Sequence, residues 1–259
     1  MEEGGRATAT GCLVRDDQGD WFQPGGRFTA FSAFRLRPLW RGAVRVTGAD
    51  FGGLERRVEA GGHVQGWATL TGTWNGGQLQ VEEQSAPVSP AAAHPRWETP
   101  PCPTPPGGWP TVTRRGAVEL AYDLGDLAES GAAVAATLFR PAEDHAVLVV
   151  AAADPATVEA WLRPQLGRAL CVVPSRWTKN HLDSVRRHLG EQFESWHLLQ
   201  LGPVHGEDGQ PYIAASLARV RPEIADWAAT LPSGILTLTP WLTPLPSRPA
   251  AAVANGRPR

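Results

Sequence analysis

Five arginines and six aromatic residues occur together in residues 21–49, a segment without an acidic side chain. Arginine binds phosphates and aromatic rings stack on bases, so this combination is typical of single-stranded nucleic-acid binding. Tryptophan and arginine are also the residues that concentrate binding energy at protein–protein contacts. The segment therefore predicts a binding surface, and its candidate contact residues are Phe31, Arg35, Arg37 and Arg41.

The charge balance favours a protein partner over a nucleic acid. The whole chain has a net charge of −2, and residues 116–245 hold 15 acidic and 9 basic side chains, a balance of −6. Proteins dedicated to nucleic acids usually show a positive excess. We expect the arginines to face the acidic second half of the chain or another protein, and nucleic acid is the alternative partner.

Asp154 and Ser175 each follow a predicted strand and precede a predicted helix. In open α/β sheets, ligands collect at the carboxyl ends of strands, and helix N-termini attract anions. Both residues are therefore candidate binding residues, and an enzyme with its site between two α/β halves is a further alternative. Asp154 also precedes Pro155, the arrangement of an N-cap followed by proline at the first helical position.

No residue spacing predicts a metal site or a catalytic constellation. His181 and His188 share one side of a predicted helix, but seven residues separate them by about 10.5 Å, too far to ligate one ion. His205, Glu207 and Asp208 could bind a cation, but this loop is what a solvated hairpin tip looks like. The sequence contains no dinucleotide-binding, phosphate-loop, hydrolase or kinase motif. We expect a non-catalytic protein without a cofactor or metal.

Cys12, Cys102 and Cys171 are odd in number and far apart. Their spacing predicts neither a CxxC metal pair nor a disulfide framework, and Cys171, inside "ALCVV", is expected to be a buried, unreactive thiol. The N-terminal residues lack the pattern of a signal peptide, and no run approaches the roughly 20 apolar residues that cross a bilayer. The expectation is a cytoplasmic protein without a membrane partner. Its arginine-rich, lysine-poor composition is typical of a GC-rich bacterial genome.

The stretch 63–83, "HVQGWATLTGTWNGGQLQVEE", alternates apolar and polar residues around an Asn-Gly turn. The turn favours a hairpin in which Leu70 and Trp74 share a core-facing side with Leu79 across the turn. Trp67 then lies on the opposite side. Because a barrel has only one interior, we expect Trp67 on the outer surface, in contact with the rest of the chain or with a partner.

Similar strand and turn signals recur through residues 6–86, without a helical pattern. This rhythm resembles an OB-fold, a small five-stranded β-barrel. The resemblance implies a fold and a ligand-binding face, but no catalytic residue. Residues 87–110, with nine prolines, predict a semi-extended linker, and residues 246–259 predict a disordered tail.

Residues 111–245 change to strands that alternate with helices, the pattern of an α/β region. Segments beginning at Pro155 and Pro222 repeat one order: proline, helix with a tryptophan, leucine-rich end, short apolar strand. Each segment follows a predicted hairpin. We therefore expect an α+β protein whose second region consists of two ferredoxin-like βαββαβ halves, about 111–174 and 169–245. Chance similarity between alanine-rich segments is the alternative.

These observations predict a two-domain binding or adaptor protein that acts through protein–protein contacts. Its eleven tryptophans are of the residue type favoured at interfaces. Single-stranded nucleic-acid binding by the barrel, and catalysis between the α/β halves, are the alternatives.

Overall fold

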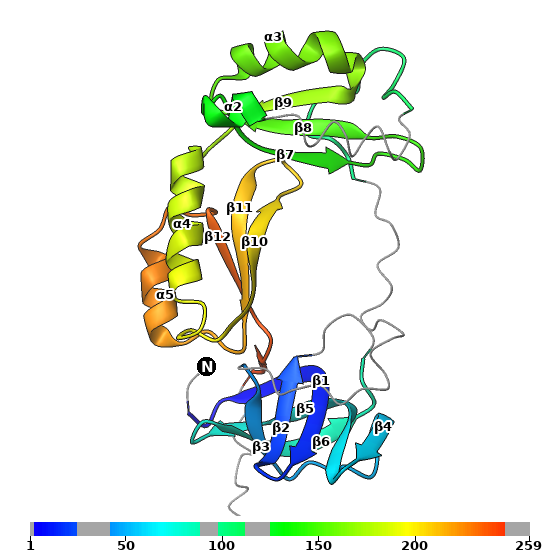
Figure 1. Cartoon of the computed structure of the whole chain (residues 1–259), viewed down its shortest axis with the longest axis vertical. Helices are drawn as coiled ribbons and strands as arrows, with labels where there is room; N and C mark the ends of the chain where they lie inside the picture. The colour runs from blue at the N-terminus through cyan, green and yellow to red at the C-terminus, as the bar shows by residue number, and fades with distance from the viewer. Residues whose placement is uncertain (1–2, 25–41, 89–97, 112–124, 247–259) are drawn as a thin grey trace, which may run out of the picture. The chain divides into compact units, whose positions relative to one another are not determined.

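The computed structural model describes residues 3–24, 42–88, 98–111 and 125–246. The fold is mixed α+β and mostly sheet, with few helices (Figure 1). The chain divides into two compact units. The first contains Met1–Ser89, Leu217–Arg221 and Pro240–Arg259, and the second contains Pro90–Ser216 and Pro222–Thr239.

The strands of the first unit close into a ring. They are β1 (Arg6–Asp16), β2 (Gly19–Pro24), β3 (Val44–Thr47), β4 (Glu55–Ala60), β5 (His63–Asn75) and β6 (Gln78–Ser85). β1 pairs antiparallel with β2 on one side and with β5 on the other. β2–β3 and β5–β6 are also antiparallel, β3 and β6 pair in parallel, and β4 extends the sheet beyond β5. The described residues of this unit contain no helix.

Alternation along β5 and β6 builds the core of the ring. Leu70 and Leu79 are fully buried and Trp74 is 3% exposed, and all three belong to one apolar cluster. The predicted core-facing side of the hairpin is therefore confirmed. The turn itself consists of Gly76 and Gly77, with φ of +57° and +81°, a region that glycine adopts without steric cost. It lies one residue later than the Asn-Gly pair suggests.

The C-terminal segment returns to complete this core. β13 (Thr243–Pro244) pairs antiparallel with β1. The indole Nε1 of Trp241 donates to the Thr10 carbonyl oxygen at 3.0 Å, and its ring centre lies 4.7 Å from that of Phe22. Leu242 is fully buried in the same cluster. The pattern of residues 6–86 contains no signal for this return.

The second unit contains two three-stranded sheets among its described residues. The first consists of β7 (Ala133–Phe139), β8 (Val147–Ala152) and β9 (Leu170–Pro174), and the second of β10 (Leu198–His205), β11 (Pro211–Leu217) and β12 (Leu236–Pro240). The helices are α2 (Gly125–Glu129), α3 (Pro155–Leu166), α4 (Lys179–Glu191) and α5 (Pro222–Ala229). Every residue of β8 is buried, as expected for a central strand with both faces covered.

The ferredoxin-like arrangement is not confirmed. β9 pairs in parallel with β8, so among the described residues it belongs to the first sheet and does not join β10, β11 and β12. A simpler order recurs instead: a hairpin, a helix that begins at a proline, and a strand that pairs with the second strand of the hairpin. The predicted helix starts at Pro155 and Pro222 are confirmed.

We predict that Leu242→Ala lowers the free energy of unfolding of the first unit by about 2–5 kcal/mol, because the substitution opens a cavity in a closed core. Thr243→Ala, at the adjacent exposed position of β13, should change it by less than about 0.5 kcal/mol. Urea denaturation followed by tryptophan fluorescence measures both variants. Equal effects would contradict the packing of this segment inside the ring.

Candidate functional site

Trp67 lies on the outer side of the ring. Its neighbours Ala68 and Leu70 belong to the buried core cluster, and alternation along β5 points Trp67 the other way. The residues opposite it are Cys12 on β1 and Glu55 on β4. Trp67 is half-buried. It is therefore neither a core residue nor a bare platform.

Among the arginine and aromatic residues of 21–49, the structure brings Trp21 and Arg45 together. They are register partners on β2 and β3, and the guanidinium carbon lies 4.4 Å from the centre of the indole ring, a cation–π geometry. The next residue of β2, Phe22, is fully buried, so the pair lies on the outer side of the ring. The candidate residues outside the described part of the chain are Phe31, Arg35, Arg37 and Arg41.

Two aspartates of this unit form hydrogen bonds with Trp21 and Arg15. Asp16 Oδ1 accepts a hydrogen bond from Trp21 Nε1 at 3.3 Å. Arg15 donates to both carboxylate oxygens of Asp20 at 2.6 and 2.7 Å, and the hydrogen bond to Asp20 raises the pKa of Arg15. The charge of Arg15 is thus already balanced within the chain, which weakens this end of the ring as a phosphate site.

Asp154 follows β8 and caps α3. Its Oδ2 accepts from the Thr157 hydroxyl at 2.6 Å and its Oδ1 from the Thr157 backbone N–H at 3.2 Å. These hydrogen bonds, the one from the hydroxyl first, lower the pKa of the Asp154 carboxyl because they stabilise its charged form. The predicted N-cap is confirmed.

Ser175 follows β9, the parallel neighbour of β8, and so lies at the same edge of the sheet as Asp154. Its hydroxyl donates to the Trp177 carbonyl oxygen at 2.8 Å and accepts from the Trp177 N–H at 3.3 Å. Neither Asp154 nor Ser175 lines either of the two cavities described below. The enzyme hypothesis therefore gains no geometric support at these residues.

The tip of the β10–β11 hairpin docks on the first sheet of the second unit. Gly209, at φ +71°, has no room for a side chain, because an added Cβ would lie 2.8 Å from Val149 Cγ1. The Gln210 side chain donates to the Pro174 carbonyl oxygen and accepts from the Arg176 N–H, both at 2.9 Å. Gly209 and Gln210 thus contact β8, β9 and the residues that follow β9, which are distant in sequence. The expectation of a solvated tip is therefore wrong for these two residues.

A cavity of about 1030 Å³ lies beside the docked tip. Its walls are residues 98–101 and 203–208, together with Thr137 and Phe139 of β7. His205 is half-buried, and its Nε2 is buried without a hydrogen-bond partner among the described residues. Burial lowers the pKa of His205, which favours the neutral imidazole. The sequence identified His205 as a candidate. It did not predict the opposite wall, residues 98–101, because the proline-rich composition of this segment does not indicate where the segment lies in the fold.

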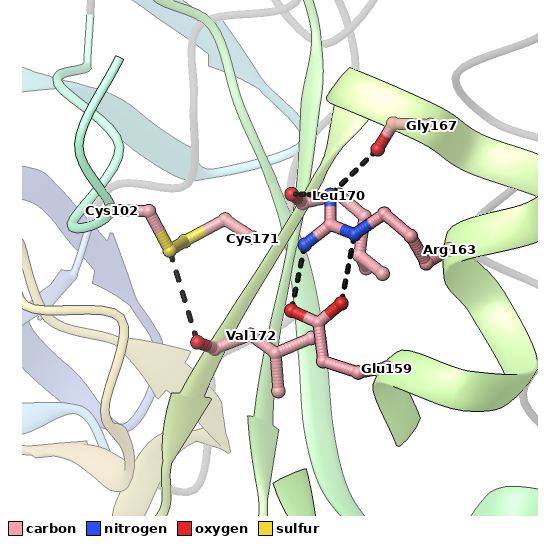
Figure 2. A network of polar contacts seen from close by, with 7 residues as sticks. All are labelled: Cys102, Glu159, Arg163, Gly167, Leu170, Cys171 and Val172. Atoms are coloured by element: carbon pink, nitrogen blue, oxygen red, sulfur yellow. Dashed lines mark hydrogen bonds and ion pairs between the residues drawn. A yellow bond between two sulfur atoms is a disulfide. The ribbon is translucent and has the colours of Figure 1, made fainter. Parts of the chain in front are cut away.

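A disulfide fastens the proline-rich segment to β9, as Figure 2 shows. It joins Cys102 to Cys171 across 69 residues, and so corrects the expectation that Cys171 is a free thiol. Arg168 Nη1 also donates to the Pro106 carbonyl oxygen at 3.1 Å. Residues 98–111 are therefore attached to the second unit.

Arg163, shown in Figure 2, forms its hydrogen bonds with other residues of this chain. Arg163 donates to both carboxylate oxygens of Glu159 at 2.8 and 2.6 Å, and to the carbonyl oxygens of Gly167 and Leu170 at 2.6 and 2.8 Å. These contacts hold the end of α3 against β9. A second cavity, of about 450 Å³, borders this network, but the arginine's Nε and both terminal nitrogens already have partners.

The histidines of α4 do not form a metal site. His188 stacks on Trp227 with ring centres 4.5 Å apart, and Trp196 lies 5.5 Å from His188. Within the described ranges, no group of three or more His, Cys, Asp or Glu residues is placed to hold a metal ion. His188 is therefore part of an aromatic cluster.

Comparison with protein-family models, curated proteins and solved structures gives no match. None of the helices in the described ranges is long and apolar enough to cross a membrane.

We predict that replacing Cys102 and Cys171 by serine lowers the free energy of unfolding of the second unit by about 4 kcal/mol, because a cross-link over this chain length restricts the unfolded state. Thermal unfolding with and without dithiothreitol measures the effect. Reductant should destabilise the native protein and leave the double variant unchanged. A native protein indifferent to reductant would contradict the bridge.

Proposed function

We propose that the protein is a non-catalytic binding or adaptor protein that acts through protein–protein contacts on the outer face of α3. The observation that carries this proposal is Trp161, which is 43% exposed on that helix. Its exposed neighbours at helical spacing are Thr157, Pro164 and Gln165. Tryptophan is the residue type most enriched among those that dominate protein–protein binding energy.

Comparison of the two halves of the second unit supports this surface. Trp161 and Trp227 each lie in the helix that follows a hairpin. Trp227 is covered by His188 and Trp196, whose ring centres lie 4.5 and 5.3 Å from its own. The described residues place no aromatic ring against Trp161. A position that is packed in one half and open in the other favours an external partner at α3.

We infer in addition that the ring of the first unit is an OB-like barrel, because five strands, β1, β2, β3, β6 and β5, succeed one another around it. In OB-folds the face of the second and third strands binds oligonucleotides. Trp21 and Arg45 lie on those strands in stacking geometry, which favours single-stranded nucleic-acid binding as a second candidate. We rank it second because of the nearby carboxylates and the net charge of −2.

A photo-crosslinking amino acid at position 161, introduced in the cells that naturally contain the protein, tests the first candidate. We predict a discrete adduct with one protein, because the exposed α3 face is the proposed contact. Position 187, exposed on α4, is the control and should not give that adduct. The same adducts from both positions, or none from position 161, would contradict the proposal.

Fluorescence anisotropy with labelled single-stranded oligonucleotides distinguishes the second candidate function from the first. If the protein acts through protein–protein contacts alone, we predict no salt-sensitive binding of the oligonucleotides. Binding that weakens as salt rises, and that Arg45→Ala reduces while Arg187→Ala does not, would favour nucleic acid instead, because phosphate contacts release counterions.

A further inference from the structure

We propose that the cavity beside the β10–β11 tip binds a small organic cation, an amine or guanidinium group carried on an aliphatic chain. This site is separate from the α3 surface, so the two proposals stand or fall independently. Its volume, about 1030 Å³, is at the upper end of the range of small-molecule sites. It lies wholly within the second unit.

The charge of the walls selects a cation. Three carboxylates line the cavity, from Glu98, Glu207 and Asp208, and none of the described arginines or lysines does. Asp208 is paired with Arg176 at 2.9 Å. Glu98 and Glu207 have no ion pair with any described residue, so two negative charges remain available to a ligand. Hydrogen bonds that involve charged groups are about twice as strong as neutral ones.

The prolines of the cavity walls also favour a cation over an anion. Pro100, Pro101 and Pro203 line the cavity, and a proline has a backbone carbonyl oxygen but no N–H group. These three wall positions therefore offer no backbone N–H group to an anion. The proline rings and Phe139 also supply apolar surface for an aliphatic chain.

His205 supplies an unsatisfied polar atom at the same place. Within the described part of the chain its Nε2 is buried and has no hydrogen-bond partner, which is a costly arrangement. Burial favours the neutral form, and the Nε2 of a neutral imidazole with its proton on Nδ1 accepts a hydrogen bond.

Both walls are held in place before a ligand arrives. The Cys102–Cys171 disulfide immediately follows residues 98–101, and Gly209 and Gln210 anchor the tip that carries 203–208 on the opposite side. A preformed site loses less conformational entropy on binding.

Isothermal titration of the full chain with spermidine, and separately with an acetylated, amidated Gly-Arg-Gly peptide, tests the site. Tighter binding of spermidine identifies a free polyamine as the ligand type, and tighter binding of the peptide identifies a protein side chain. Either result supports the proposal if the combined substitution Glu98→Gln and Glu207→Gln weakens binding about tenfold or more.

Glu191→Gln, exposed on α4 and outside the cavity, is the matched control and should leave the affinity unchanged. A shift of the His205 imidazole NMR signals on titration of the wild-type chain gives a second readout that does not depend on the variants. Failure of both probes to bind, or equal weakening by the cavity and control substitutions, would overturn the proposal.

Discussion

The fold of the first unit depends on one strand that pairs along both of its edges. β1 is antiparallel to β5 from Arg6 to Arg15 and to β2 from Gly11 to Asp16. This double pairing leaves β1 itself without an open edge, and it forces the sheet to have an inside and an outside. Leu70 and Trp74 fill the inside, while Trp67 and the Trp21–Arg45 pair are left outside.

A second constraint, the docking of distant segments, organises the other unit. The hairpin tip at Gly209 approaches β8 too closely for any side chain, and the Cys102–Cys171 bridge draws the proline-rich segment onto β9. Together they form the walls of the acidic cavity. The exposed face of α3 carries Trp161 outward. We propose that the ring is a scaffold and that the second unit offers two separate surfaces, one for a protein and one for a cation.

Local patterns predicted the local structure well. The β5–β6 hairpin, the Asp154 cap and the helices starting at Pro155 and Pro222 follow from alternation, capping and turn chemistry that act within a few residues. Long-range contacts were not predictable in this way. Leu242 in the ring, the disulfide across 69 residues and the pairing of β9 with β8 depend on which surfaces meet in space, which one sequence does not record. The cavity walls were missed for the same reason.

Hydrogen exchange of the β1 backbone amides, measured residue by residue by NMR, tests the closed ring most directly. Successive amides of an antiparallel strand point alternately to its two neighbours. If β1 pairs with both β2 and β5, the amides of residues 11–15 should all exchange slowly, whether odd or even. Fast exchange at every second residue would show β1 to be the edge of an open sheet, and the inside and outside assigned to the first unit would then be wrong.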